Sequence, residues 1–252
     1  MKYISKKLKD SRVFKGVYEI ARPYLPKRGK EGFHGDAIYQ KLIRKILDIP
    51  ATSFIETGTY QGDSTTFVAY HNRNIPIFTS EVNESIHKKA QPLLRRFKNI
   101  NSFLLSSEKM ITALIKNGQI GNLPLFYLDA HWYDFWPLED EIEIISDAKI
   151  KCIIVIDDFQ VPDRPDFLCD FYEETGKTDK KTCNMELIRP KMNKSNCYKI
   201  IFPNYKQVDL TKEGGKAHKL PGHTAIFQNC ADLFSTFIKE KVIKDYYAEL
   251  NY

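Results

Sequence analysis

The sequence has no long apolar run. None of its 252 residues belong to an uninterrupted apolar stretch near the roughly 20 residues that a membrane span needs. The first residues are charged and polar, where a secretory signal would need an apolar segment. The five cysteines are widely spaced and form no C-x-x-C pair, which disfavours zinc and redox sites and fits reduced thiols. We therefore expect a soluble, cytoplasmic protein.

Motifs for phosphate and nucleic-acid recognition are also missing. The chain has no G-x-x-x-x-G-K-[ST] loop, no zinc finger and no aromatic-rich RNA motif. The net charge is +6, and ten lysines and arginines crowd between Lys2 and Lys30. This basic extension, residues 1–35, is interrupted by Pro23 and Pro26. We favour a solvated or packing segment, with an anionic partner such as nucleic acid or lipid as the alternative.

The rest of the chain, residues 36–252, alternates apolar strands with amphipathic helices. Asp36 is placed to cap a helix whose apolar residues recur at helical spacing from Ile38 to Leu47. A content of 42% hydrophobic residues is enough for one large core. Continuous apolar runs separated by such helices are typical of a buried parallel sheet. The expected strands are 54–56, 77–81, 102–105, 124–129 and 152–156.

The final third of the chain departs from this rhythm. Residues 159–196 are rich in Asp, Lys, Pro and Asn, and we expect a long loop or small insertion there. Segments 198–202 and 223–227 are expected as closing strands, joined by a hairpin turn at Gly214 and Gly215. The predicted fold class is α/β, a Rossmann-like doubly wound sheet of seven mainly parallel strands with an antiparallel strand near the C-terminus.

The most informative motif is a strand that ends in an acid and a glycine turn, Glu56-Thr57-Gly58-Thr59-Tyr60-Gln61-Gly62-Asp63-Ser64. Glycines let the backbone turn tightly, and the helix amides after Gly62, together with Ser64, favour polar or negative groups. Glu56 is placed to hold an ammonium group. Glu81, at the end of the second strand, occupies the position of an acid that binds ribose hydroxyls. Ser107, after the third strand, lies where adenine contacts are usual.

Two further strands end on carboxylates. The fourth runs to Asp129, two residues before His131, and the fifth to Asp157 and Asp158. Converging carboxylates repel one another, so a metal ion, a basic neighbour or a proton must balance them. Their oxygen atoms suit Mg²⁺ or a similar divalent cation, which would lower the pKa of a bound hydroxyl. His131 is then the candidate general base.

These strand ends resemble those of the class I S-adenosylmethionine-dependent methyltransferases over roughly residues 36–229. Tyr60 replaces the middle glycine of that family's E/D-x-G-x-G-x-G loop. The sequence is more similar to the metal-assisted macrocin O-methyltransferases and the cephalosporin-hydroxylase-like group. The resemblance implies O-methylation of a hydroxyl on a sugar, glycan or small molecule, with S-adenosylmethionine as cofactor. It implies catalytic roles for His131 and Asp129, metal binding by Asp129, Asp157 and Asp158, and cofactor contacts from Glu56, Thr57, Gly58, Tyr60, Gly62, Ser64, Glu81, Ser107 and Asp129.

Other interpretations stay open. The glycine loop can be an ordinary strand-to-helix turn. Asp157 and Asp158 can cap the next segment or a turn, and His131 can be a hydrogen-bonded structural histidine. The aromatic cluster of Trp132, Tyr133, Phe135 and Trp136 can line an acceptor pocket, although packing is slightly favoured. The run Glu139–Glu141 is expected to face solvent. A Mg²⁺-dependent phosphate-processing enzyme and a nucleotide- or RNA-binding protein are the alternative functions; Glu56 beside the glycines would repel phosphate. Neither His34 nor His218 has a partner identifiable from sequence.

Overall fold

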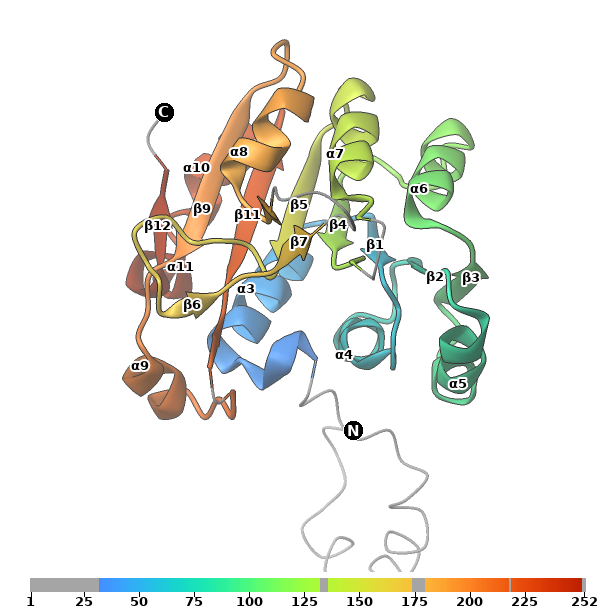
Figure 1. Ribbon diagram of the computed structural model, residues 1–252, viewed down its shortest axis with the longest axis horizontal. Helices are drawn as coiled ribbons and strands as arrows, with labels where there is room; N and C mark the ends of the chain where they lie inside the picture. Colours follow the sequence, from blue (N-terminus) through green and yellow to red (C-terminus); the bar gives the residue numbers. More distant parts are fainter. Residues whose placement is uncertain (1–31, 132–135, 174–179, 218, 251–252) are drawn as a thin grey trace, which may run out of the picture.

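A central eight-stranded sheet organises the protein. The computed structural model describes residues 32–131, 136–173, 180–217 and 219–250. The strands lie in the order β12-β9-β11-β5-β4-β1-β2-β3 (Figure 1). Their bounds are β1 Ser53–Thr57, β2 Ile77–Glu81, β3 Ile100–Leu104, β4 Pro124–Leu128, β5 Cys152–Asp157, β9 Tyr198–Pro203, β11 His223–Gln228 and β12 Tyr247–Glu249.

Helices cover both faces of the sheet. Figure 1 shows α3, α4 and α5 on one side and α6 and α7 on the other. Their bounds are α3 Ala37–Asp48, α4 Asp63–His71, α5 Glu84–Leu94, α6 Ser107–Lys116 and α7 Leu138–Asp147, followed late in the chain by α9 Gln207–Lys212, α10 Ala231–Phe237 and α11 Lys241–Tyr246. Within the described ranges, every helix is too short or too polar to span a lipid bilayer.

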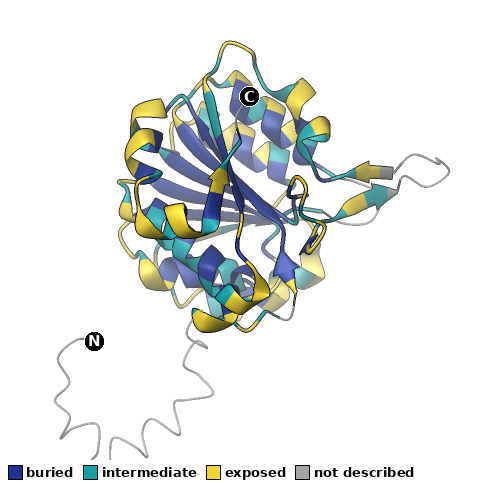
Figure 2. Ribbon diagram, turned by 90° about the vertical axis from the view of Figure 1, so that its left-hand side faces the viewer, coloured by how far each residue is buried: buried dark blue, intermediate teal, exposed yellow. Residues whose placement is uncertain are grey.

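The core lies between these layers. Every residue of β1, β2, β4 and β5 is buried, as expected for parallel strands covered on both faces. Figure 2 shows the buried strands as a continuous inner layer beneath partly exposed helices. β3 is the edge strand and is partly exposed. The predicted helix at 37–48 is confirmed: the Asp36 side chain accepts hydrogen bonds from the backbone N–H groups of Ile38 and Tyr39.

The prediction of an α/β Rossmann-like, mainly parallel sheet is confirmed, with one strand more than expected. β11 runs antiparallel to β5, and β12 adds an eighth strand by pairing antiparallel with β9. β12 has only three residues, too few for a recognisable alternating pattern. The two predicted closing strands pair antiparallel as β9 and β11, but a tight turn at Gly214 and Gly215 does not join them, because α9 and the short strand β10, Leu220–Pro221, lie between them.

Short elements fill the region expected as a loop or insertion. They are β6 Phe167–Leu168, β7 Phe171–Glu173, β8 Lys180–Thr182, α8 Met185–Ile188 and the 3₁₀ helix η2 Arg189–Lys191. β7 and β8 pair antiparallel and form a hairpin that extends away from the body of the protein in Figure 2. Contacts join α8 and η2 to α7. This region therefore lies beside α7.

Most of the predicted basic extension, residues 1–31, lies outside the described residues. The described part begins at Gly32, and a 3₁₀ turn, η1 Phe33–Gly35, precedes α3. Phe33 is buried in the core and its ring packs against the rings of Tyr39, Phe67 and Tyr127. The segment before α3 is thereby fixed next to the end of β4.

Candidate active site

The glycine loop joins β1 to α4 at the point where the sheet order reverses, with β2 on one side of β1 and β4 on the other. Ligands bind at this position in open α/β sheets. Gly58 has a φ of +80°, and a Cβ there would lie 2.5 Å from the carbonyl oxygen of Asp129. Gly62, with a φ of +78°, is the N-cap of α4. Only glycine satisfies both the left-handed backbone and the close approach at position 58.

Glu81 fixes the far side of the loop. One carboxylate oxygen accepts a hydrogen bond from the Tyr60 backbone N–H at 3.1 Å, and the other accepts from the Asn83 N–H at 2.9 Å. Tyr60, where the methyltransferase loop has its middle glycine, adopts a φ of +43° and leaves its side chain 48% exposed. The end of β2 therefore holds the loop in its left-handed conformation.

Glu56 is enclosed beneath the loop. Its Oε2 atom accepts hydrogen bonds from the hydroxyls of Thr65 and Thr79, the latter at 2.6 Å. Burial raises the pKa of Glu56 to about 8, and the two threonine hydroxyls only partly oppose that rise. Its neighbour Thr57 accepts a hydrogen bond from the Asp129 backbone N–H at 3.1 Å. These two residues connect the loop to β2, α4 and the end of β4.

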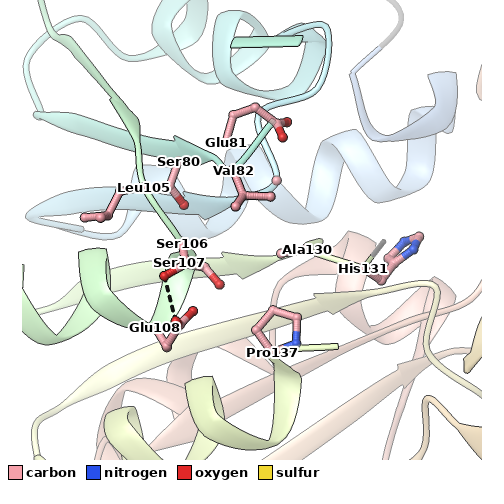
Figure 3. Close-up of a pocket in the computed structure, with 11 residues that line it drawn as sticks. Ser80, Glu81, Val82, Leu105, Ser106, Ser107, Glu108, Ala130, His131 and Pro137 are labelled. Atoms are coloured by element: carbon pink, nitrogen blue, oxygen red, sulfur yellow. Dashed lines mark hydrogen bonds between the residues drawn. The ribbon is translucent and has the colours of Figure 1, made fainter. Parts of the chain in front are cut away.

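A pocket lies between the loop and the neighbouring strand ends (Figure 3). Its volume is about 160 Å³, below the roughly 300 Å³ at which small-molecule sites begin, so it encloses only part of a larger ligand. Ser106 and Ser107 lie at the start of α6, after the third strand, which begins and ends earlier than predicted. The lining includes Gly58, Glu81, Val82, Leu105, Ser107 and His131.

Ser64 does not line this pocket. Its hydroxyl accepts a hydrogen bond, at 3.4 Å, from the backbone N–H of Phe33. Ser64 therefore ties the segment before α3 to the first turn of α4. Its predicted contact with the cofactor stays a prediction.

Asp129, Asp157 and Asp158, here called the acid cluster, lie at the adjacent ends of β4 and β5. Tyr127 joins two of them: its hydroxyl lies 2.5 Å from Asp157 Oδ2 and 3.3 Å from Asp129 Oδ2. Burial and the charge of Asp157 raise the pKa of Asp129 to about 7. The predicted convergence of these carboxylates is what the structure shows.

Two histidines balance the charge of the acid cluster. His34 Nε2 lies 2.8 Å from Asp157 Oδ2, and the Asp157 charge raises the His34 pKa to about 10 despite burial. His131 Nε2 lies 3.4 Å from Asp158 and 3.6 Å from Asp129, while its Nδ1 is 3.1 Å from Asp170. Burial lowers the His131 pKa, but these carboxylates outweigh it and raise the value to about 11.

The donor atoms fit a divalent cation. Asp129, His131 and Asp158 each offer a ligand atom within 4.8 Å of the others, and His34, Asp157 and Asp158 form a second such group. Asp129 and Asp157 thus fall in different groups that share Asp158. Asp157 Oδ1 is buried and has no hydrogen-bond partner among the described residues. Carboxylates with imidazole suit Mn²⁺ and related metals as well as Mg²⁺.

Backbone strain concentrates at this edge of the sheet. Seven non-glycine residues of the described chain have positive φ, and four of them, Phe33, His34, Tyr60 and Asp158, adjoin the loop or the acid cluster. Such conformations cost on the order of 1–3 kcal/mol each and cluster at functional sites. The strain is independent support for a functional site at this position.

Sequence analysis missed three contributors. His34 is 123 residues from its partner Asp157, and no local pattern links them. Tyr127 looks like an ordinary strand residue. Glu141 was expected in solvent but is fully buried, and burial raises its pKa to about 8, although the hydroxyls of Ser107 and Thr57 partly oppose that rise. Helical periodicity is the only sequence signal for its burial, because it places this residue of the first turn of α7 on the face toward the sheet.

Comparison with known proteins supports the fold. The sequence matches no protein-family model and no curated protein. Among solved structures, a candidate O-methyltransferase of Klebsiella pneumoniae is 13% identical, with a TM-score of 0.53 over 87% of this chain and 91% of that one. An O-methyltransferase of Bacillus cereus, solved in complex with SAH, is 14% identical, with a TM-score of 0.48 over 90% and 93% of the two chains. At 13% identity, the likeness to the Klebsiella pneumoniae structure shows the fold alone, a Rossmann-like α/β fold.

Proposed function

We propose that the protein is an S-adenosylmethionine-dependent O-methyltransferase that acts on a hydroxyl of a sugar, glycan or other small molecule with the help of a divalent metal. One observation carries the proposal. The pocket lined by Gly58, Glu81 and Ser107 ends at His131, and His131 in turn contacts Asp129 and Asp158. The proposed nucleoside pocket and the acid cluster thus meet at His131.

The pocket suits the nucleoside part of the cofactor. Glu81 lines it with a buried carboxylate that has lone pairs left for ribose hydroxyls. Val82 and Leu105 are exposed apolar residues of the pocket lining, 66% and 36% accessible. They offer the faces between which an adenine ring would be shielded from water. The buried Ser107 also lines the pocket, at the start of α6.

The transfer itself requires positioning. S-adenosylmethionine supplies a methyl group on a sulfonium; the carbon–sulfur bond breaks as a carbon–oxygen bond forms to the acceptor, and the acceptor loses its hydroxyl proton. Asp129 and His131 adjoin the pocket and are placed to hold the acceptor hydroxyl there.

His131 is the proposed proton acceptor. With its pKa raised by Asp129 and Asp158, it is protonated at neutral pH and serves as a base only when other positive charge satisfies those carboxylates. A divalent cation held by Asp129 and Asp158 would supply that charge and Lewis acidity toward the hydroxyl. The metal and the base are therefore linked in this proposal.

Calorimetry of SAH binding tests the proposal. The wild-type chain should bind SAH, and Glu81→Ala should weaken binding at least about tenfold, because a buried acceptor for ribose hydroxyls is lost. Glu84→Ala is the matched control: Glu84 is also acidic but exposed and paired with Lys88, so its loss should leave SAH affinity unchanged. Equal SAH affinity in both variants, or binding of ATP without binding of SAH, would overturn the assignment.

A further inference from the structure

A second cavity, here called the hairpin cavity, lies beside the acid cluster. It has a volume of about 330 Å³, within the range of small-molecule sites. Its walls come from the start of α7, the β7–β8 hairpin and the α8–η2 segment. The hairpin and the α8–η2 segment follow each other in the chain, separate from α7, and both belong to the 159–196 region that interrupts the α/β alternation. The side chains that matter are Trp136, Glu139, Asp140, Tyr172, Lys181 and Lys191.

Two aromatic rings form one corner of the hairpin cavity. The ring centroids of Trp136 and Tyr172 are 6.5 Å apart and their planes meet at 52°. Both residues are partly exposed and line the hairpin cavity. Tilted rings offer a concave apolar surface rather than a slot with parallel walls. The C–H face of a saturated ring fits such a corner better than a flat aromatic molecule does.

The polar wall of the hairpin cavity is charged but balanced. It presents two carboxylates, from Glu139 and Asp140, and two ammonium groups, from Lys181 and Lys191. Lys181 lies 2.6 Å from Glu139, and Lys191 lies 2.9 Å from Glu143 on the same helix. Since each lysine already faces a carboxylate, an anionic ligand such as a nucleoside phosphate gains little there. A neutral ligand with many hydroxyls can donate to the carboxylates and accept from the ammonium groups.

The hairpin cavity connects to the proposed site of methyl transfer. Trp136 and Leu138 line it and also line the small cavity around Asp129, Asp157 and Asp158. A ligand packed on Trp136 would thus lie next to the acid cluster. His131 lines both that small cavity and the nucleoside pocket. The three spaces follow one another in the order nucleoside pocket, acid cluster, hairpin cavity.

We propose that the hairpin cavity is the acceptor subsite and that it binds a neutral saccharide, free or at the end of a glycan, through Trp136, Tyr172 and Lys181. This inference rests on the proposed methyltransferase function and specifies its acceptor. One ring of the saccharide packs on the aromatic corner, its hydroxyls contact the paired charges, and one hydroxyl reaches the acid cluster. The β7–β8 hairpin is then the element that determines acceptor specificity.

Saturation-transfer NMR on the full chain with SAH present tests the subsite. The probes are methyl glycosides of glucose, galactose, mannose and rhamnose, a disaccharide, catechol as a flat phenol, and glucose 1-phosphate as an anion. We expect at least one neutral saccharide to bind more tightly than catechol and glucose 1-phosphate. A disaccharide that binds more tightly than the methyl glycosides indicates that the subsite takes the end of a glycan. Equal affinity of the disaccharide and the methyl glycosides indicates a free sugar.

Variants localise the binding. Tyr172→Ala and Lys181→Ala should each weaken saccharide affinity about fivefold or more, and Trp136→Ala more strongly, with Trp136→Phe restoring part of it. Lys199→Ala is the matched control, because Lys199 is likewise exposed and paired with a glutamate, Glu249, but lies on β9. SAH affinity is measured on every variant and should stay within about twofold of the wild-type value. Unchanged SAH affinity shows that the variant is folded.

The outcomes separate the two proposals. If the wild-type chain does not bind SAH, the proposed function itself is refuted. The subsite alone is overturned if SAH binds normally but no saccharide binds, or if catechol or glucose 1-phosphate is preferred. It is also overturned if SAH binds normally and the saccharide affinity is unchanged in all three hairpin-cavity variants.

Discussion

At the scale of single residues, Gly58 couples the loop to the neighbouring strand. The Cβ of any other residue would lie 2.5 Å from the Asp129 carbonyl oxygen, in a backbone conformation that L-residues disfavour. Asp129 belongs to the acid cluster, so the position of the loop and the position of the cluster depend on the same contact. This glycine was predicted from the sequence, but its contact with Asp129 was not, because local pattern does not show which strand lies beside a turn.

Gly58→Ala should destabilise the protein by more than the cost of placing alanine in a left-handed backbone conformation. Gly118 provides the control: its φ is +65°, and a Cβ there would meet nothing within 4 Å. We expect Gly118→Ala to cost about 1 kcal/mol and Gly58→Ala at least about 2 kcal/mol more, measured by urea unfolding, because only the second adds a clash with backbone. Similar losses in the two variants would refute the close approach.

Glu56 makes stability depend on pH. Its pKa is raised from 4.5 to about 8, so the folded protein holds the proton more tightly than the unfolded chain does. The stability contributed by this group therefore falls as the pH rises from about 4.5 to about 8, and changes little above that. The sign is opposite to that of a carboxylate whose pKa is lowered by a salt bridge.

Glu56→Gln should remove this dependence. Relative to the wild type, the variant should gain stability on going from pH 5 to pH 8, by an amount on the order of a few kcal/mol. Chemical denaturation at several pH values measures the difference. A constant offset between the two proteins across that range would show that Glu56 ionises normally in the fold.

At the scale of elements, one helix cap was predicted from the sequence and a second was found in the structure. Asp36 caps α3 as predicted, and Asn83 caps α5 by accepting from the N–H groups of Ser85 and Ile86. The two caps differ in burial: Asp36 is fully buried and also accepts a hydrogen bond from the Tyr205 hydroxyl at 2.6 Å, whereas Asn83 is exposed. The cap residue was visible in sequence; its partner, 169 residues away, was not.

Removal of the two caps should therefore have unequal costs. Asn83→Ala should cost about 1 kcal/mol, since water replaces the lost acceptor. Asp36→Ala should cost about 2–4 kcal/mol, because it leaves two backbone N–H groups and a tyrosine hydroxyl buried without their acceptor. Thermal and urea unfolding of both variants test this order, and equal costs would contradict it.

Strands were predicted where they are long and apolar and missed where they are short. β2 and β5 are visible as continuous runs, whereas β12 and the paired strands β7 and β8 have only three residues each. Their pairing depends on contacts with distant chain rather than on local pattern. The hairpin that shapes the proposed acceptor subsite belongs to this second group, so the subsite could not have been located from sequence.

At the scale of the whole molecule, the strand order explains why part of the site was predictable. Parallel strands place their carboxyl ends at one edge, so Glu81, Asp129 and Asp157 were expected at the same edge once β2, β4 and β5 were recognised. His34 and Glu141 reach the same region from a segment before α3 and from the first turn of α7. Nothing in a strand pattern indicates them, because long-range packing decides their orientation.

A divalent metal should stabilise the whole fold if the acid cluster binds it. Addition of Mn²⁺ or Mg²⁺ should raise the melting temperature by a few degrees, since a ligand that binds only the folded state stabilises it. Asp158→Asn should abolish the increase; asparagine tolerates the φ of +47° found there. Asp166→Asn, at an exposed aspartate paired with Arg164, should retain it. Equal shifts in both variants would place the metal elsewhere.

The central claim is that the glycine loop, Glu81 and the acid cluster form one site for methyl transfer. A crystal structure of the full chain with SAH bound tests it most directly. We predict density for the ribose at Glu81, for the adenine between Val82 and Leu105, and for the sulfur directed toward His131 and Asp129. An SAH molecule bound elsewhere, or one whose sulfur points away from the acid cluster, would contradict the account.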